Sequence, residues 1–266
     1  MNPPNDESGC QSGYDITFSV VSHGQGNLIR SLLDDLSLIS RHSFEVLLTV
    51  NIAEDEAYIG NRPFPLTVIR NSDPKGFGAN HNAAFRVASG RYFFVVNPDI
   101  RLLGFDFSHA FSLFTRADVA AVVPKVLGPT GHVEDSVRRF PTPFKLIRRL
   151  LWDRGRDVYA WSTQPFEVEW AAGMFIILRP AAFTHMSGFD EERYFMYFED
   201  VDLCWRLRCS GWVVVADPAI SVEHHARRAA RKSVLHFSWF VSSALKFFLR
   251  KYSILWRRDN RRSNAG

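Results

Sequence analysis

The segment Phe93-Phe94-Val95-Val96-Asn97-Pro98-Asp99 decides how the rest of the chain is interpreted. Its apolar start predicts a buried strand, Tyr92–Val96, that runs directly into a carboxylate. In open α/β sheets, ligands bind at the carboxyl ends of the strands. A carboxylate placed there can hold a hard divalent cation, which neutralises a diphosphate. Asn-Pro-Asp is also good turn chemistry, and the segment taken alone favours a turn.

Short apolar runs alternate with helical patterns on both sides of this segment. Asn27 can cap a helix whose apolar positions fall on one face. Further helices are expected at Phe144–Trp152 and Glu199–Cys209. The other expected strands are Ile16–Ser22, Phe44–Val50, Leu66–Arg70, Val119–Val123, Phe175–Leu178 and Trp212–Ala216. This alternation predicts an α/β fold with a mostly parallel sheet and helices on its faces.

Composition indicates an ordinary globular protein, with 46% hydrophobic and 23% charged residues in a chain of 266. The three cysteines are odd in number, and two of them share one short segment, which suits free thiols in a reducing compartment. Residues 1–13 are polar and lack the apolar core of a signal peptide. We therefore expect a disordered N-terminus over residues 1–13 and a cytoplasmic protein.

The positive charge is concentrated at the C-terminal end. The chain carries 32 Lys/Arg and 28 Asp/Glu. Residues 226–266 hold 11 of these basic residues and one acid, Asp259, so their net charge is +10 and that of residues 1–225 is −6. A helix expected over Val234–Trp256 is too often interrupted by charge to span a membrane, but its aromatic residues suit an interface. The asymmetry predicts an anionic partner, and a membrane surface fits better than nucleic acid because no RNA-binding motif is present.

A glycine-rich loop, Lys75-Gly76-Phe77-Gly78-Ala79-Asn80-His81-Asn82, precedes the Asn-Pro-Asp strand. Its glycines let the backbone approach a ligand closely, and Asn82 can bond a base or a ribose. The loop is not the G-x-G-x-x-G dinucleotide fingerprint, because the third glycine is missing. A flexible loop that opens a helix explains it equally well.

Three acids crowd the start of one expected helix, at Glu199, Asp200 and Asp202. Acids favour a helix N-terminus, and Asp202 can pair with Arg206 one turn later. Capping does not require all three acids together. Crowded carboxylates raise one another's pKa, which suits a general base. We therefore expect the base in this segment.

A histidine ends the last apolar run, in Ser221-Val222-Glu223-His224-His225. A histidine at a strand end can bind a metal or a phosphate. A lone surface histidine is the commoner outcome. The position of His224 after the other motifs favours the functional interpretation.

In this order, the segments resemble family 2 glycosyltransferases, especially the bacterial rhamnosyltransferase-like branch. The resemblance covers about residues 15–233. Its motifs are Gly76-Phe77, Asn97-Pro98-Asp99, Trp170-Ala171-Ala172-Gly173, Gly188-Phe189-Asp190, Phe195 to Leu203, and His224. Each motif is weak alone, but the ordered set is specific.

The resemblance implies a GT-A fold over residues 14–232, with a nucleotide-binding sheet merged with an acceptor-binding half and a basic helical tail at 233–266. It also implies a divalent cation, Mg²⁺ or Mn²⁺, and direct displacement with inversion at the sugar carbon. Asp99 matches the metal-binding carboxylate, with Asn97 in the place of the first Asp of the family motif. His224 matches a metal or pyrophosphate contact. Asp200 matches the base, and Glu199 is its main competitor.

The implied substrates are a nucleoside-diphosphate sugar and a glycan or polyprenyl-linked acceptor in cell-surface polysaccharide synthesis, with rhamnose from a deoxythymidine diphosphate as the donor the family favours. Such an enzyme would lie on the cytoplasmic face of the inner membrane. The implied nucleotide-sugar contacts are Ser22, Asn51, Lys75, Gly76, Asn82, Asn97 and Gly173. The chain departs from the family at Asn51-Ile52-Ala53-Glu54-Asp55, where Asp-Asn-x-Ser-x-Asp is usual, and at Pro74, where Asn is usual. The first of these departures lies in the loop that meets the nucleotide base in the family.

Two other classes stay open at this point. A nucleotidyltransferase usually has a basic glycine-rich loop near its N-terminus, whereas Ser22-His23-Gly24-Gln25-Gly26-Asn27 contains no Lys or Arg. A non-catalytic scaffold does not need the acids at positions 99, 199, 200 and 202, and turnover of a nucleotide sugar distinguishes it from an enzyme.

Overall fold

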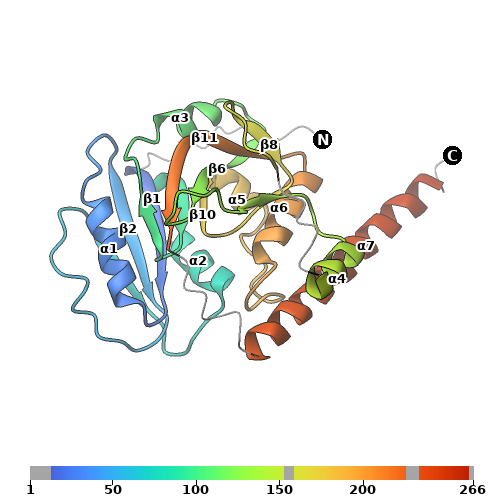
Figure 1. The fold of residues 1–266 in the computed structure, drawn as a ribbon, viewed down its shortest axis with the longest axis horizontal. Coiled ribbons are helices and arrows are strands. Elements are labelled where there is room, and N and C mark those ends of the chain that lie inside the picture. The colour runs from blue at the N-terminus through green and yellow to red at the C-terminus, as the bar shows by residue number, and fades with distance from the viewer. Residues whose placement is uncertain (1–12, 153–158, 226–233, 264–266) are drawn as a thin grey trace.

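The computed structural model describes residues 13–152, 159–225 and 234–263. The predicted disordered N-terminus therefore lies outside the described residues, apart from Gly13. One nine-stranded sheet runs through the centre in the order β3-β2-β1-β4-β10-β6-β11-β5, with β8 paired to β11 (Figure 1). A two-stranded sheet, β7-β9, lies apart from it.

The strands have the following bounds: β1 Tyr14–Ser22, β2 Phe44–Val50, β3 Leu66–Arg70, β4 Gly90–Val96, β5 Ile100–Leu102, β6 Val119–Leu127, β7 Val137–Arg138, β8 Phe166–Val168, β9 Trp170–Ala171, β10 Phe175–Leu178 and β11 Val213–His224. The helices are α1 Gly26–Leu36, α2 Phe77–Phe85, α3 Ser108–Leu113, α4 Pro143–Trp152, α5 Pro180–His185, α6 Glu199–Cys209 and α7 Val234–Ser263. The predicted bounds of β2, β3, β10 and α6 agree with the structure residue for residue.

The other predicted elements differ from the structure in one or both bounds, and two of them show why. The strand predicted to end at Ala216 continues through irregular pairing as far as His224. Asn27 does not cap α1, because the helix already begins at Gly26 and Gln25 occupies the cap position without a side-chain hydrogen bond. In each case the neighbouring strands or the preceding loop, and not the local sequence, decide the boundary.

The strand directions bring several predicted site residues to one edge of the sheet. Strands β3, β2, β1 and β4 are mutually parallel. Strand β10 enters between β4 and β6 antiparallel to both, so β6 and its partner β11 point the same way as β4. The carboxyl ends of β1 to β4 and of β11 therefore meet at the same edge.

Two apolar clusters cover the two faces of the sheet. Phe18, Phe94 and Phe107 belong to the first cluster, with ring centroids of Phe18 and Phe94 4.9 Å apart. The second cluster contains Phe93 and Phe183 and extends to helices α5, α6 and α7. The many phenylalanines thus serve mainly as core, where each buried ring contributes roughly 1.5–3 kcal/mol.

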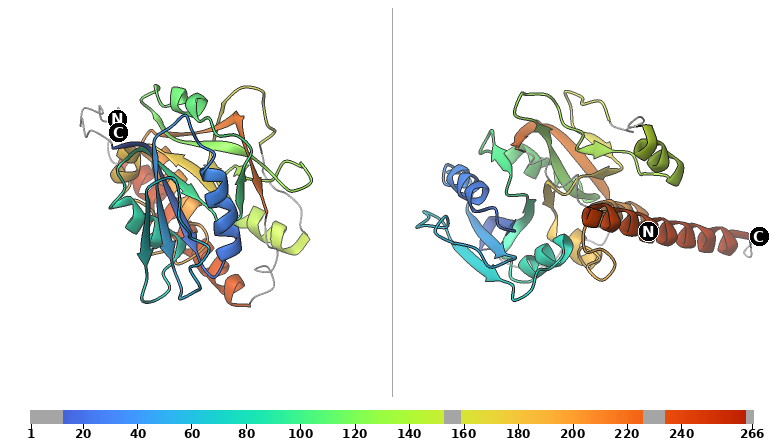
Figure 2. Two further views of the ribbon diagram at one scale, coloured as in Figure 1. Left: turned by 90° about the vertical axis from the view of Figure 1, so that its left-hand side faces the viewer. Right: turned by 60° about the horizontal axis from the view of Figure 1, so that its bottom comes forward.

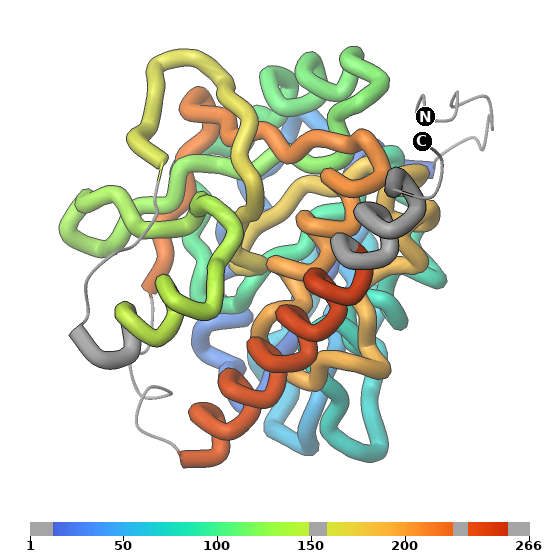
Figure 3. The backbone as a smooth tube through the Cα atoms, turned by 90° about the vertical axis from the view of Figure 1, so that its right-hand side faces the viewer, coloured from blue at the N-terminus to red at the C-terminus, as the bar shows by residue number. Residues whose placement is uncertain are grey.

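Helix α7 packs one face against the domain and extends beyond it at its C-terminal end (Figures 1 and 2). Phe247 is fully buried, and its ring lies 5.6 Å from Phe198 and 6.2 Å from Trp205 of α6. Figure 3 shows α7 running along the outside of the α6 region, with α4 to one side. Within the described residues, no helix combines the length and the apolar character that crossing a membrane requires.

Candidate active site

Asp99 and His224 meet at the carboxyl edge of the sheet. His224 ends β11, where it pairs with Ile100 of β5, the residue after Asp99. The Nε2 atom of His224 lies 3.2 Å from Oδ2 of Asp99, and the His225 amide donates to the Asp99 carbonyl at 2.8 Å. Two residues 125 positions apart are therefore held together by the β5–β11 pairing.

Glu134 completes a row of three polar side chains. Its Oε2 lies 2.7 Å from Nδ1 of His224, on the side opposite Asp99. Burial alone would lower the pKa of His224, but the hydrogen bonds and charges of Asp99 and Glu134 outweigh it and raise that pKa to about 9. The imidazole is thus oriented from both sides.

The site fits a divalent cation in part. The second carboxylate oxygen of Asp99, Oδ1, is buried and has no hydrogen-bond partner. A histidine that donates one ring nitrogen to a carboxylate, as His224 does to Glu134, is the usual arrangement of a metal-binding histidine. No group of three or more His, Cys, Asp or Glu side chains with metal-binding geometry occurs among the described residues. One carboxylate with substrate phosphates and water is, however, a common way to hold Mg²⁺.

The loop before α6 holds the two predicted catalytic acids in fixed positions. Tyr197 and Phe198 both have left-handed backbones, with φ of 70° and 67°. Such conformations cost non-glycine residues about 1–3 kcal/mol each and occur mainly at functional sites. The amide of Gly173 donates to Oδ2 of Asp200 at 3.0 Å. Because Gly173 precedes Met174, whose carbonyl accepts from the Asn97 amide at 2.9 Å, Asp200 is anchored to the same sheet edge.

The two acids differ in exposure. Glu199 is only 7% exposed and its Oε2 has no hydrogen-bond partner, whereas Asp200 is half-buried. Burial and the neighbouring charge of Asp200 raise the pKa of Glu199 to about 8. Burial also raises the pKa of Asp200, opposed by the amides of Gly173 and Val201 and by the charge of Arg138. The third acid, Asp202, pairs with Arg206 at 2.6 Å, as predicted.

The expected nucleotide contacts at the ends of β2 and β3 form a hydrogen-bonded network. Asn51 is 5% exposed, and its side chain both donates to the Lys75 carbonyl and accepts from the Lys75 amide. Asn71 donates to Asn51 at 2.8 Å and to Asn80 at 2.7 Å. These hydrogen bonds fix the loop at Lys75, and the side chain of Lys75 is exposed.

Three expected contacts are placed where the protein itself uses them. Ser22 is completely buried. A side chain added at Gly76 would come within 2.2 Å of the Phe195 carbonyl oxygen, so the close backbone approach here is to protein. Asn82 is also used by the protein, since its amide donates to the Phe189 carbonyl and to Glu191 and accepts from the Phe189 amide.

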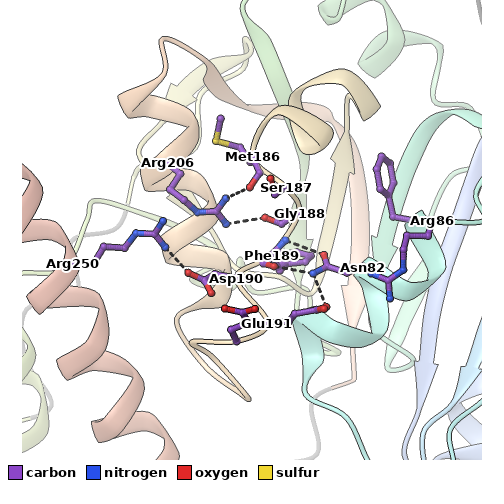
Figure 4. Close-up of a pocket in the computed structure, with 12 residues that line it drawn as sticks. Asn82, Arg86, Met186, Ser187, Gly188, Phe189, Asp190, Glu191, Arg206 and Arg250 are labelled. Atoms are coloured by element: carbon purple, nitrogen blue, oxygen red, sulfur yellow. Dashed lines mark hydrogen bonds and ion pairs between the residues drawn. The ribbon is translucent and has the colours of Figure 1, made fainter.

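Asn82 instead lines a cavity of about 540 Å³ between α2, α6 and α7, shown in Figure 4. The charged groups there are paired: Arg206 donates to the carbonyls of Met186 and Gly188, and Arg250 contacts Asp190 at 2.7 Å. None of Asp99, Asp200 and His224 lines this cavity. It is therefore a junction that connects α7 to the loop before α6.

Sequence reasoning missed Glu134, Arg138 and Asn71. Glu134 follows a turn after β6, and its only sequence feature is a carboxylate next to Asp135. Asn71 follows β3, so the rule that polar residues at parallel strand ends gather at one edge could have found it. No local pattern identifies Glu134 or Arg138, because tertiary contacts alone bring them to the site.

No protein-family model matches this chain. The chain is 28% identical to rhamnosyltransferase WbbL of Escherichia coli (strain K12) over 275 residues, which cover 92% of this chain and 97% of that protein. It is 33% identical to the N-acetylglucosaminyl-diphospho-decaprenol L-rhamnosyltransferase of Mycobacterium tuberculosis over 147 residues, 52% of this chain and 48% of that protein.

Solved structures with a similar fold are glycosyltransferases. A mannosyltransferase from Pyrobaculum calidifontis, in complex with GDP-Man and Mn²⁺, superposes with a TM-score of 0.61 at 16% identity, over 90% of this chain and 64% of that one. GalNAc-T7 with UDP, GalNAc and Mn²⁺ gives 0.59 at 14% identity, over 80% and 44%. S. aureus TarS with UDP-GlcNAc gives 0.55 at 16% identity, over 81% and 59%. The chain thus spans about half to two thirds of these structures, and the predicted GT-A fold is confirmed.

Proposed function

We propose that this chain, whose sequence similarities and fold support a rhamnosyltransferase-like glycosyltransferase of family 2, moves a sugar from a nucleoside-diphosphate donor to a hydroxyl of a glycan or lipid-linked acceptor. The observation that carries the proposal is the meeting of Asp99, His224 and the Gly173–Asp200 contact at one edge of the sheet. The similarity to rhamnosyltransferases supports a sugar-transferring role in polysaccharide synthesis. Rhamnose is the proposed sugar.

Asp200 is the proposed base for a direct displacement with inversion. An acceptor alcohol is a poor nucleophile near neutral pH, so a positioned carboxylate assists its attack as the diphosphate leaves. Asp200 is the more exposed of the two adjacent acids, and the Gly173 and Val201 amides fix both of its oxygens. Glu199, beside Asp200, is buried and has a raised pKa, so it is better placed to hold a proton.

Asp99 and His224 are the proposed cation ligands, with Glu134 orienting the imidazole, and a cation would have to displace the Nε2 proton that the two carboxylates favour. A divalent cation bound there would neutralise charge on the departing diphosphate. The unpaired, buried Oδ1 of Asp99 supports this assignment, because such an oxygen is otherwise costly. Mn²⁺ in two structurally similar glycosyltransferases agrees with it.

The nucleotide is proposed to bind at the ends of β1 and β2. A cavity of about 320 Å³ lies there, lined by residues of the loop after β1 and the loop after β2. Arg30 and Asp55 supply charged and hydrogen-bonding groups, and the Tyr58 hydroxyl donates to Glu54 at 2.9 Å. The network of Asn51, Asn71 and Lys75 borders this region at the same sheet edge.

A peripheral position on the cytoplasmic face of the inner membrane is proposed for the whole protein. Helix α7 carries an exposed apolar stripe that includes Leu245 (58% exposed) and Leu249 (72%). Helix α4 exposes Phe144 (72%) and Ile147 (54%). Neither α4 nor residues 234–258 contain an acid, and the basic residues around them suit anionic lipid. Lys251 of α7 lies 5.6 Å from the ring of Phe140, just before α4, which connects the two helices.

A panel of nucleotide sugars, screened by thermal shift with and without Mn²⁺, tests the function. A donor should raise the melting temperature only when metal is present, because binding to the native state alone stabilises it. The variant Asp99→Ala should remain folded and lose both the metal-dependent shift and sugar transfer. Unchanged transfer by Asp99→Ala, or by the wild-type protein in excess chelator, would contradict the metal assignment.

A further inference from the structure

A cavity of about 300 Å³ opens beside Glu134, the residue that orients His224. Its wall is formed by Val133, Glu134, Asp135, Val137, Tyr159, Ala160 and Trp161. The mechanism proposed above gives this cavity no role. Its wall combines two aromatic side chains with two carboxylates, which is an unusual combination for a packing defect.

The wall of the cavity connects the two halves of the reaction centre. At one end, Glu134 contacts His224 at 2.7 Å. Two residues later, the carbonyl of Ser136 accepts from the Ala172 amide at 2.8 Å. Gly173, the residue after Ala172, donates its amide to Oδ2 of Asp200. A molecule in the cavity therefore borders the segment that links the cation ligands to the base.

The aromatic side chains are held in place. The ring of Trp161 lies 5.5 Å edge-on from Phe166, and that of Tyr159 lies 6.0 Å from the same ring. The Arg139 guanidinium lies 5.1 Å over Tyr159. Both rings remain half-buried, so they present apolar surface to the cavity at little further ordering cost.

The carboxylates are oriented as well. Arg138 donates to Asp135 at 2.7 Å, and Glu134 is fixed by His224. A pyranose has an apolar face of C–H groups and an edge of hydroxyl donors. Aromatic surface and oriented carboxylate acceptors match these two features. The negative charges disfavour a sugar acid such as a uronic acid.

We propose that this cavity is the acceptor subsite and that it holds a neutral pyranose, stacked on Trp161 and bonded through its hydroxyls to Glu134 and Asp135. The assignment rests on the proposed transferase function, since it gives the cavity the second substrate of that reaction. It places the acceptor ring next to the segment that anchors Asp200, where its reacting hydroxyl would be deprotonated.

Saturation-transfer NMR on the full chain tests the subsite without requiring turnover. The probes are methyl N-acetyl-β-glucosaminide, which is neutral, and methyl β-glucuronide, which is anionic, each at millimolar concentration. The neutral probe should receive saturation on its ring protons and the anionic one should not. Trp161→Ala should weaken the binding roughly tenfold, the size expected from loss of an aromatic contact.

A second variant and a control keep the test independent of folding defects. Ala160 is exposed and lines the cavity, so Ala160→Trp should block sugar binding by filling the space. Phe237→Ala removes an exposed aromatic of α7 and should leave binding unchanged. All three variants should keep the donor-induced thermal shift.

The outcomes separate this inference from the proposed function. If no nucleotide sugar stabilises the protein, the transferase assignment fails whatever the saccharide result. If a donor binds, but the neutral probe gives no saturation transfer or binds equally well to Trp161→Ala and Ala160→Trp, the acceptor subsite is overturned. Binding of the anionic probe as strongly as the neutral one would overturn the assignment of a neutral sugar.

Discussion

At the level of single residues, the proposed chemistry depends on a difference between two adjacent acids. Glu199 and Asp200 are neighbours in sequence, yet Glu199 is buried and its Oε2 has no hydrogen-bond partner, whereas Asp200 is half-buried with both oxygens fixed. When the environments of two acids push their pKa values apart, one acid can be assigned to hold a proton and the other to accept one. The left-handed backbones of Tyr197 and Phe198 lie directly before these two acids, where the chain enters α6.

The first prediction concerns Asp200. Asp200→Asn keeps the shape and removes the proton acceptor, so turnover should fall by about 10²–10⁴ while donor binding and melting temperature stay near wild-type values. Steady-state transfer assays and the donor thermal shift measure both. Glu199→Gln is the matched control and should retain most of the activity. Normal turnover in Asp200→Asn with loss in Glu199→Gln would move the base to Glu199.

A second prediction concerns the pH dependence of stability. Burial and the charge of Asp200 raise the folded-state pKa of Glu199 from 4.5 to about 8. The native state therefore binds more protons than the unfolded state between these values, and the free energy of unfolding falls as pH rises through this window. Glu199→Gln should remove that slope and be more stable than wild type above pH 8, with the difference shrinking toward pH 5. Urea unfolding at several pH values measures this. The prediction is contradicted if the free energy of unfolding depends on pH in the same way in the two proteins.

At the level of elements, the described part of α7 packs against the domain through its inner face. Its aromatic side chains pack on α6, and Arg250 reaches the fully buried Asp202 at 3.1 Å and Asp190 at 2.7 Å. Asp202 lies two residues after the proposed base. The position of α7 is therefore coupled to the helix that carries Asp200.

The third prediction tests this connection. Arg250→Ala leaves Asp202 buried with Arg206 as its remaining basic partner and should lower the free energy of unfolding by about 1–3 kcal/mol. Arg193→Ala is the control, because Arg193 is 41% exposed and pairs only with Asp190 at 3.2 Å in this cluster. That variant should change stability by less than about 1 kcal/mol. Chemical denaturation compares them, and equal effects of the two would show that Arg250 adds only surface charge.

At the level of the whole molecule, the exposed apolar residues of α4 and α7 and the candidate active site lie on different elements. Figure 3 shows α4 and α7 on one side of the domain, and both helices carry exposed apolar residues. The sheet edge proposed to bind the nucleotide instead carries Asp99, Asp200 and their amide and histidine partners. Such a division suits an enzyme that binds a membrane with one surface and a soluble donor with another.

The fourth prediction concerns this surface. Wild-type protein should float with anionic vesicles more strongly than with neutral ones, and less so at high salt. Leu245→Glu with Leu249→Glu should reduce flotation severely, because two charges replace exposed apolar residues of α7. Leu38→Glu with Leu103→Glu makes the same charge change at exposed positions outside α4 and α7 and should bind normally. Equal binding of wild type to neutral and anionic vesicles, or to neither, would refute the electrostatic interaction.

The sequence alone determined the fold class and most element positions, because local apolar periodicity and turn residues specify strands and helices without reference to distant contacts. It also singled out Asp99 and His224 at the ends of apolar runs, and Asp200 in a cluster of acids at the start of a helix. It gave Asn82 and Gly76 a ligand role, although the structure shows that their contacts are with the protein.

Only the tertiary structure decided which of these groups meet. The β5–β11 pairing joins Asp99 to His224, and the loop after β6 brings Glu134 to the same imidazole. Whether Glu199 or Asp200 is buried, and whether α7 turns its aromatic residues inward, likewise follow from packing between elements far apart in the chain. The physical reason is that burial and hydrogen-bond partners are set by residues distant in sequence, whereas backbone periodicity is set by residues nearby.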